Sequence, residues 1–344
     1  MAQHAAIIGD GAMATVCALT LHDQGIGVSM WSPDPAQSSA MIQTRENRRY
    51  LPGYPLPEPL RFSAEEDAAF AGADFVVSAI PSQYVRPAWQ RLAEACPAGV
   101  PIVSVAKGIE RETLLRPTQV ILDVLGELDE QGQARPDSRA VAALSGPTVA
   151  DELAKNLPAT ATAASEDADF AALVQRAFTT DWFRIYTNDD LLGVELAGAT
   201  KNVIAIAAGI LDGLKAGNNA KSALLARGLA EIARLGVALG ARQETFFGVA
   251  GVGDLATTCF SPTGRNRTCG EGLGKGHKLD DVLKEIPGVV EGVPTTEAVV
   301  ALADRHDVDM PIVRALYRVL FEGLDPLEGI SELMKREAKP ERVA

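Results

Sequence analysis

A lysine near the middle of the chain is the residue best placed to move a proton. Lys201 lies in the helix-compatible stretch 195–202, just ahead of the apolar run 203–211. An amine at the edge of a core is costly unless it has a partner or a task. The four histidines lie outside every segment that carries other candidate residues, which leaves Lys201 as the expected proton donor.

Further candidates follow apolar runs that predict buried strands. Lys107 comes just after the run 102–105, and Gly146 and Thr148 come just after the run 141–144. Ligands gather at the carboxyl ends of parallel strands, so these positions favour a binding role. The alternatives are a surface role for Lys107 and a plain helix cap for Thr148.

A glycine-rich stretch, residues 248–276, is expected to be loop or broken helix. Within it, Arg265 and Asn266 combine a guanidinium with an amide, a pair suited to phosphate or carboxylate, although exposed loop arginines are usually only solvated. Asp254 lies in a turn that its glycine neighbours make flexible. Its carboxylate could hold the Lys201 ammonium or accept a bond from a substrate hydroxyl.

The chain begins with a pattern typical of dinucleotide binding. The apolar run 5–8 ends in Gly9-Asp10-Gly11, and a helical pattern covers residues 12–24, so Gly9, Gly11 and Ala14 fit G-x-G-x-x-A. The glycines allow a tight turn and close approach of a pyrophosphate to the helix N-terminus. The position after a strand and before a helix is the required context. The alternative is an incidental glycine turn.

The residues after the second predicted strand leave the choice of cofactor open. The strand 28–31 is followed by Ser32 and Pro33, with no carboxylate to bind the ribose hydroxyls of NAD. Arg45, Arg48 and Arg49 on the next loop could attract the 2′-phosphate of NADP, or could form a solvated loop face. The expected cofactor is therefore NADP or NAD.

Composition excludes several classes of partner. The formal net charge of −13 argues against nucleic acid or an anionic membrane as the main partner. The N-terminus shows no signal-peptide pattern, and the run 203–211 falls short of the ~20 residues of a spanning helix, so no membrane insertion is expected. The four cysteines lack close pairing and histidine partners, which predicts reduced thiols, no metal site and a cytoplasmic location.

Strand patterns recur through the first half of the chain and then stop. The predicted strands are residues 5–8, 28–31, 74–80, 102–105, 141–144, 160–164 and 183–186, and the predicted later helices are 191–214, 220–239 and 295–305. Alternation of strands with helices is typical of a mainly parallel sheet covered on both faces. The proline-rich residues 32–59 are expected to form a long loop with at most a short helix. The fold class is therefore α/β: a Rossmann-like, mainly parallel sheet domain, residues 1–190, then an all-α domain, residues 191–344.

With these segments in order, the chain resembles the NAD(P)-dependent glycerol-3-phosphate dehydrogenases of the bacterial type over nearly its whole length. The matching segments are Gly9-Asp10-Gly11, residues 47–53, Lys107-Gly108, Gly146-Pro147-Thr148, residues 195–208, residues 251–255, Arg265-Asn266-Arg267 and Val290-Glu291-Gly292. The resemblance implies interconversion of dihydroxyacetone phosphate and sn-glycerol 3-phosphate with NAD(P)H, the latter feeding phospholipid synthesis. It is compatible with a homodimer.

The resemblance also implies roles for individual residues. Lys201 matches the family's proton-transferring lysine. The implied substrate contacts are Lys107, Gly146, Thr148, Lys201, Asp254, Gly264, Arg265 and Asn266. The implied cofactor contacts are Gly9, Gly11, Ala12, Met13, Pro33, Tyr50, Lys107, Ala150, Arg265, Val289 and Glu291.

The chain departs from the family pattern at a few of these positions. The family usually has serine and an aromatic residue where Ala12 and Met13 stand, and often a basic residue at Pro33, so a strong NADP preference is not implied. Gly264 stands where the family usually has serine, so one hydroxyl contact is missing unless Thr263 supplies it. Two alternative functions are a related two-domain reductase of a 2-keto or 3-hydroxy acid, and a non-catalytic dinucleotide sensor.

Overall fold

The chain divides into two compact units. The computed structural model describes residues 2–338, 340 and 341. The first unit comprises Met1–Ala106 and Pro117–Leu191, and the second comprises Lys107–Arg116 and Leu192–Ala344. The assignment of Lys107–Arg116 to the second unit differs from the predicted single boundary at residue 190. This segment belongs with the helical unit because Ile109, in its middle, is buried in that unit's core.

An eight-stranded sheet forms the centre of the first unit. Its strands, in spatial order, are β10 (Phe183–Asn188), β9 (Ala159–Ala164), β8 (Val141–Ser145), β7 (Ile102–Ser104), β6 (Phe75–Ser78), β1 (His4–Ile8), β2 (Gly27–Trp31) and β5 (Arg61–Ser63). Neighbouring strands pair in parallel except β8 and β9, which are antiparallel. The prediction of a mainly parallel sheet is confirmed, and the short edge strand β5 is the one the sequence patterns did not predict.

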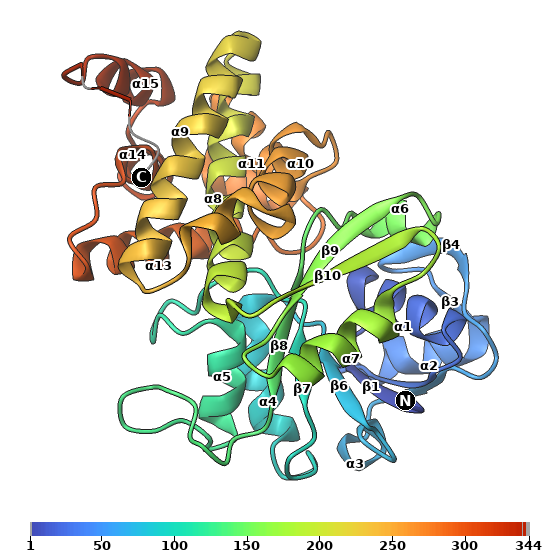
Figure 1. The fold of residues 1–344 in the computed structure, drawn as a ribbon. Helices are drawn as coiled ribbons and strands as arrows, with labels where there is room; N and C mark the ends of the chain where they lie inside the picture. The colour runs from blue at the N-terminus through green and yellow to red at the C-terminus, as the bar shows by residue number, and fades with distance from the viewer. Residues whose placement is uncertain (1, 339, 342–344) are drawn as a thin grey trace. The chain divides into compact units, whose positions relative to one another are not determined.

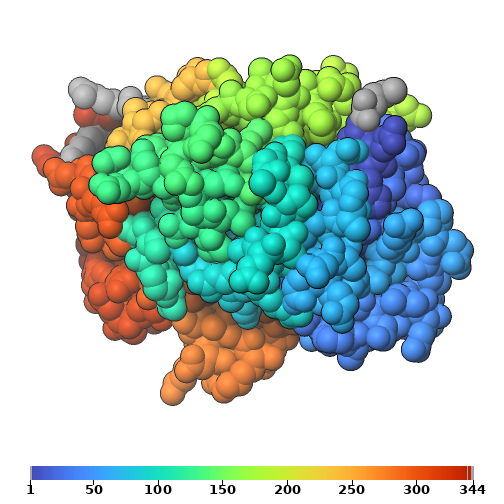
Figure 2. Space-filling model, turned by 90° about the horizontal axis from the view of Figure 1, so that it is seen from below, coloured from blue at the N-terminus to red at the C-terminus, as the bar shows by residue number. Residues whose placement is uncertain are grey.

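Helices cover both faces of this sheet (Figure 1). The helices are α1 (Ala12–Asp23), α2 (Pro35–Thr44), α3 (Glu66–Ala69), α4 (Val85–Leu92), α5 (Pro117–Val124), α6 (Ala150–Ala154) and α7 (Ala168–Phe178), with a 3₁₀ turn η1 (Ser82–Tyr84). Helix α1 packs with α6 and α7, whereas α4 packs with α5. In Figure 2 the residues from α3 to the segment after α5, coloured light blue to green, form much of the face toward the viewer.

Residues 32–59 are more ordered than the predicted long loop. They hold the ten-residue helix α2 and a hairpin of β3 (Glu46–Asn47) and β4 (Leu51–Pro55). Asp34 caps α2, because its carboxylate accepts hydrogen bonds from the backbone N–H groups of Ala36 and Gln37. Pro35 fills the first helical position, where a missing N–H costs nothing and the fixed φ favours a helix. This proline therefore starts a helix rather than a loop.

Among the described residues of the second unit, the regular elements are all helices or helical turns. Its elements are α8 (Leu191–Gly213), α9 (Gly217–Ala238), the 3₁₀ turn η2 (Gln243–Phe247), the π-helical turn η3 (Val249–Gly253), α10 (Asp254–Phe260), α11 (Arg265–Gly274), α12 (Leu279–Glu285), α13 (Gly292–Arg305), α14 (Pro311–Phe321) and α15 (Pro326–Met334). The three predicted helices are present as α8, α9 and α13. The glycine-rich stretch is a broken helix, formed by η3, α10 and α11.

Close backbone packing sets α11 against α8. A Cβ atom on Gly270 would collide with the carbonyl oxygen of Ile206, and one on Gly209 would collide with the carbonyl oxygen of Arg267. Glycine is the residue that lets two helix backbones approach so closely. The first residues of α11 are thereby held at a fixed place along α8.

Helix α8 is the core helix of the second unit. It is longer than the apolar run 203–211 suggested, and by length and composition it could cross a membrane. However, 94% of its most apolar window is buried inside the protein. Val203, Ile204 and Ile206 belong to the hydrophobic core of this unit, which is separate from the core around the sheet. The apolar surface of α8 is thus accounted for by core packing.

Candidate active site

The turn after β1 has the geometry of a dinucleotide-binding turn. Gly9 has a φ of +124°, and a Cβ atom there would lie 2.5 Å from the carbonyl oxygen of Ala79. Other residues are excluded by this approach. Gly11 is the N-cap of α1, and nothing lies within 4 Å of the position of its Cβ. The N-terminus of α1, which begins with Ala12, can therefore be approached by a phosphate.

Asn47 ties the β3–β4 hairpin to this turn. Its Nδ2 donates to the backbone oxygen of Asp10 and to Thr15 Oγ1, both at 2.7 Å. Its Oδ1 accepts from the backbone N–H of Tyr50 at 3.2 Å. Asn47 is fully buried. These bonds hold the candidate cofactor residue Tyr50 near the glycine turn.

The basic residues near Pro33 and the end of β2 are engaged with the protein. The Arg45 guanidinium donates to backbone oxygens in the loop 57–60, so it holds that loop and is not free to bind a phosphate. Arg49 Nη1 lies 3.1 Å from Asp34 Oδ2. A 2′-phosphate would have to compete with that carboxylate for Arg49.

Gly146 and Thr148 follow β8, as predicted. Thr148 Oγ1 donates to the backbone oxygen of Gly146 at 3.0 Å. The N-cap of α6 is Val149, so the alternative of Thr148 as a plain helix cap is wrong. Thr148 and Met13 both line a small cavity of about 20 Å³, and Ala150 begins α6. These cofactor and substrate candidates are thus grouped within the first unit.

Lys201, Asp254 and Lys107 form one buried cluster in the second unit. Lys201 Nζ lies 2.5 Å from Asp254 Oδ1, and Lys107 Nζ lies 2.6 Å from Asp254 Oδ2. Lys201 also donates to Thr258 Oγ1 at 2.6 Å. Lys201 is 6% exposed and Asp254 is 2% exposed. The predicted contact between Asp254 and Lys201 is present, but Asp254 begins α10 instead of lying in a flexible turn.

Burial and charge set the protonation of this cluster. Burial lowers the pKa of Lys201 to about 8, with Lys107 acting in the same direction and Asp254 acting against it. Burial alone would raise the pKa of Asp254, but the two ammonium groups outweigh it and the pKa is lowered. Asp254 is therefore a carboxylate at neutral pH, whereas Lys201 can both give and take a proton.

The candidate phosphate residues begin a helix. Gly264 is the N-cap of α11, and Arg265 and Asn266 lie in its first turn, not in a loop. Arg267, next in sequence, has its Nε 2.6 Å from Asp212 Oδ2 at the end of α8. That ion pair and the glycine contacts hold Arg265 and Asn266 in place. A helix N-terminus beside a guanidinium and an amide suits an anion.

Two contacts join the start of α11 to the loop before α13. Asn266 Oδ1 accepts from the backbone N–H of Gly292 at 2.9 Å. The Arg265 guanidinium lies beside Gly288. Val289 and Glu291 lie between these glycines, so these two cofactor candidates are near the start of α11. The Glu291 charge also acts to raise the pKa of Lys201.

Local sequence patterns do not reveal two polar residues that lie at the cluster, Thr258 and Asn202. Thr258 is four residues after Asp254, a spacing that places both on one face of a helix, but the stretch was not predicted to be a regular helix. Asn202 Nδ2 donates to the backbone oxygen of Lys107 at 3.0 Å. Its place directly after Lys201 was the only signal available for it.

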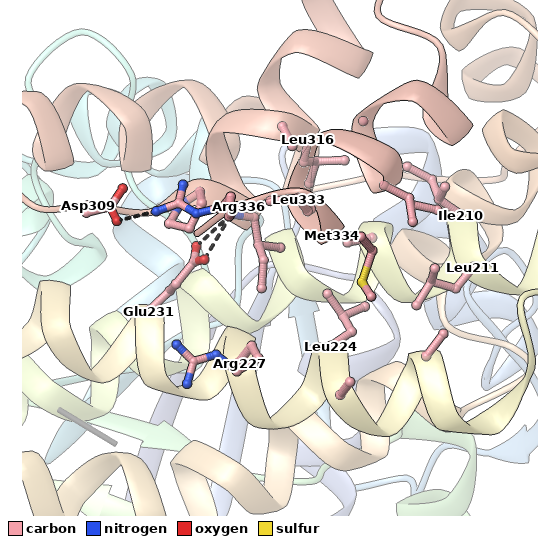
Figure 3. A pocket seen from close by; sticks show the side chains of 18 of the residues that line it. Ile210, Leu211, Leu224, Arg227, Glu231, Asp309, Leu316, Leu333, Met334 and Arg336 are labelled. Carbon is pink, nitrogen blue, oxygen red and sulfur yellow. Dashed lines mark hydrogen bonds and ion pairs between the residues drawn. The ribbon is translucent and has the colours of Figure 1, made fainter. Parts of the chain in front are cut away.

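A large cavity in the second unit is lined by none of the residues of this cluster. It has a volume of about 970 Å³ and is lined by α8, α9, α14, α15 and the residues that follow. Figure 3 shows Ile210, Leu224, Leu316 and Met334 around it, with Glu231 bonded to the backbone of α14. None of the candidate site residues lines it. Side-chain chemistry, not cavity size, therefore locates the candidate site.

Comparisons with known proteins agree along the whole chain. The family model described as NAD-dependent glycerol-3-phosphate dehydrogenase N-terminus matches residues 4–171, and the C-terminus model of the same family matches residues 190–331. The chain is 44% identical to a glycerol-3-phosphate dehydrogenase [NAD(P)+] of Prosthecochloris aestuarii, over 97% of this chain and 98% of that protein. It is also 44% identical to the protein of that name from Geobacter sulfurreducens, over 99% of this chain and 100% of the relative.

A solved structure supports the same conclusion. The crystal structure of glycerol-3-phosphate dehydrogenase from Coxiella burnetii is similar with a TM-score of 0.90 and 36% identity, covering 97% of this chain and 99% of that one. Sequence and fold thus match over both units. The chain therefore belongs to the NAD-dependent glycerol-3-phosphate dehydrogenase family.

Proposed function

We propose that the chain interconverts dihydroxyacetone phosphate and sn-glycerol 3-phosphate with NAD(P)H, and that Lys201 exchanges the proton with the substrate oxygen. The observation that carries this proposal is the buried Lys107–Asp254–Lys201 cluster. With a pKa near 8, Lys201 is mostly protonated at neutral pH and can donate a proton, and its neutral amine can take up a proton again afterwards. The product would feed phospholipid synthesis.

The first unit supports binding of the cofactor. The close approach at Gly9 and the open backbone at Gly11 fit a pyrophosphate at the N-terminus of α1. Ala12, Met13 and Tyr50 are the neighbouring candidates for contact with the dinucleotide. When bound, the nicotinamide supplies or accepts the hydride at carbon 2 of the substrate.

The second unit supports binding and activation of the substrate. Arg265, Asn266 and the N-terminus of α11 would bind the phosphate group. Lys201 would donate its proton to the ketone oxygen during reduction and recover it from the alcohol during oxidation. Asp254 orients the Lys201 ammonium, and Lys107 would stabilise negative charge as it develops on the oxygen. Low exposure of the cluster strengthens each of these interactions.

Removing the Lys201 amine tests this assignment. In Lys201→Ala we expect turnover to fall by about 10²–10⁴, because general acid–base catalysis is worth that much. Binding of NADPH or NADH, followed by fluorescence titration, should change little. Lys275→Ala, which removes the exposed lysine at the C-cap of α11, is the matched control. Turnover of the Lys201→Ala protein at the wild-type rate would remove Lys201 from the mechanism.

Substrate competition separates this function from the alternative reductase. A phosphate-binding site predicts that inorganic phosphate competes with dihydroxyacetone phosphate, and that 2-keto acids are poor substrates. Preference for a keto acid, without competition by phosphate, would favour the reductase. We also place the enzyme in the cytoplasm, a location that its four buried, free thiols support.

A further inference from the structure

The segment Lys107–Arg116 is held on α8 at both of its ends. At its start, the Asn202 side chain donates to the backbone oxygen of Lys107 at 3.0 Å. At its end, the Arg116 guanidinium pairs with the Glu195 carboxylate. Between these points the segment contains neither helix nor strand. In its middle, Glu110 makes backbone hydrogen bonds with Leu114 and Leu115, and Ile109 packs into the core. The two end anchors fix the residues on either side of this turn, where no ladder of backbone bonds acts.

The Arg116–Glu195 pair is buried, like Lys107–Asp254 and unlike the pair that Arg111 of the same segment makes with Glu297. The side chains of Arg116 and Glu195 are 15% and 1% exposed, whereas those of Arg111 and Glu297 are 53% and 36% exposed. Burying two charges costs hydration free energy, and the attraction between the charges often does not offset this cost, so stability alone does not explain such a pair. A buried pair can instead select one arrangement of the chain.

Both lysines of the cluster depend on α8 for their position. Lys201 belongs to α8, and Lys107 belongs to the segment that is anchored on α8. Lys201 projects from α8, six residues after Glu195. Lys107 reaches the same carboxylate, Asp254, from the anchored segment. The distance between the two ammonium groups therefore depends on how firmly the segment is attached to α8.

We propose that the buried Arg116–Glu195 pair is a positioning device that holds Lys107 against Asp254 for the reaction. This inference rests on the proposed function of the cluster. Lys107 is the group that would move when the pair is broken, so two properties would change together. Binding of the substrate would weaken, and the positive charge beside Lys201 would be lost.

The second change has a predictable sign. The charged groups that act on Lys201 are Asp254, Lys107 and Glu291, and among them only Lys107 lowers its pKa. The nearby Cys259 thiol stays neutral, since burial raises its pKa to about 12. When Lys107 leaves, the pKa of Lys201 therefore rises above 8. Reduction requires a protonated Lys201, so the alkaline limb of its pH profile should move to higher pH.

The experiment compares Glu195→Gln with Arg111→Gln. For each protein, kcat and KM for dihydroxyacetone phosphate are measured from pH 6 to 10 at saturating reduced cofactor, together with the thermal midpoint. In Glu195→Gln we expect KM to rise about fivefold or more, and the alkaline limb of kcat/KM to move up by about half a pH unit or more. Arg111→Gln, which breaks the surface pair of the same segment, should keep the wild-type KM and the wild-type alkaline limb of kcat/KM.

A second variant covers the case in which Glu195→Gln does not fold. Arg116→Lys keeps the charge but loses the fork of parallel donors, so it should show the same two changes with smaller size. If the pair is purely structural, breaking it should lower the amount of active protein and the thermal midpoint and leave KM and the alkaline limb of kcat/KM unchanged. That result in either variant overturns the positioning role. A wild-type protein that does not oxidise NAD(P)H with dihydroxyacetone phosphate would instead contradict the proposed function.

Discussion

The Lys201 ammonium has three N–H donors, and the folded chain uses two of them, on Asp254 and Thr258. The third has no acceptor among the described residues. In the proposed reaction it is the donor that would reach the substrate oxygen. The two occupied bonds fix the direction of the third, so under this proposal Thr258 would aim Lys201 as well as stabilise its charge.

Thr258→Val tests this role with little change in shape. Loss of a hydrogen bond from a charged group costs ~1.5–3 kcal/mol, so we expect kcat/KM to fall by about tenfold or more. The charged form of Lys201 loses an acceptor, so its pKa should fall and the alkaline limb for reduction should move to lower pH. The neighbouring Thr257→Val, whose hydroxyl bonds the backbone of Gly253, is the control. Equal effects of the two variants would remove the specific role of Thr258.

Single residues of the site differ in how far sequence reveals them. Lys201 was predicted because an amine before an apolar run stands out in one short window. The contact of Asp254 with Lys201 was one of two interpretations, and the fold contains this contact. The ion pair of Arg116 with Glu195 joins residues 79 apart in sequence. No local pattern indicates such a pair, since it depends on where a segment without regular structure folds back.

Helix α11 illustrates how elements, more than loops, place the site. Gly270→Ala would put a methyl group against the carbonyl oxygen of Ile206 and push α11 away from α8. Overpacking of this kind costs ~1–3 kcal/mol, so the free energy of unfolding should fall by that amount. We also expect KM for dihydroxyacetone phosphate to rise, because Arg265 moves with α11.

Thr268→Ala is the matched control for this helix. Thr268 is an exposed residue of α11, so the change removes no contact with α8. Urea unfolding and steady-state kinetics of both variants measure the difference. If Gly270→Ala kept the wild-type stability and KM, close packing of α11 on α8 would not be what positions Arg265.

Helix α14 depends on a carboxylate from α9. Both oxygens of Glu231 accept bonds from the backbone N–H of Ile312, and one also accepts from Val313. Burial raises the pKa of Glu231 to about 7, and these N–H groups only partly oppose the shift. The folded chain then binds a proton more tightly than the unfolded chain. This contribution to stability is full below pH 4.5 and is lost as the pH rises through 7.

Glu231→Gln should remove this pH dependence. Between pH 5 and 7.5 the free energy of unfolding of the wild-type protein should fall relative to that of the variant by up to about 3 kcal/mol. Urea denaturation at several pH values measures the difference, and Glu297→Gln on the surface is the control. A constant difference across this range would mean that Glu231 is already ionised in the fold at pH 5.

At the scale of elements, buried strands were easier to predict than the helices around them. Strands such as β6 and β8 are continuous apolar runs, because a parallel sheet is covered on both faces. Local sequence does not predict helix α2, because a proline such as Pro35 is usually a loop signal, although Asp34 before it is a good N-cap. The glycines from η3 to α11 predict either loop or broken helix, since they serve packing against α8 and Phe246 as well as turns.

The molecule as a whole repels the anions that it is proposed to bind. Its net charge is −13, and both dihydroxyacetone phosphate and NAD(P)H are negative. The attraction comes from few cations at short range, among them Lys107, Lys201 and Arg265. Whether the net charge or the nearby cations control association depends on how far each charge lies from the ligand, because the Debye length is about 30 Å at 0.01 M salt and about 8 Å at 0.15 M.

Nearby charges act on a bound or arriving anion more strongly than the spread of carboxylates, so we expect added salt to weaken binding. Between 0.01 and 0.3 M KCl, kcat/KM for dihydroxyacetone phosphate should fall roughly threefold or more at saturating cofactor. Lys107→Gln should flatten this dependence, whereas Lys278→Gln, the same change in charge at an exposed site, should leave it as in the wild type. A rise of kcat/KM with salt would mean that the net charge dominates, and that the Lys107–Asp254–Lys201 cluster acts only after the substrate has bound.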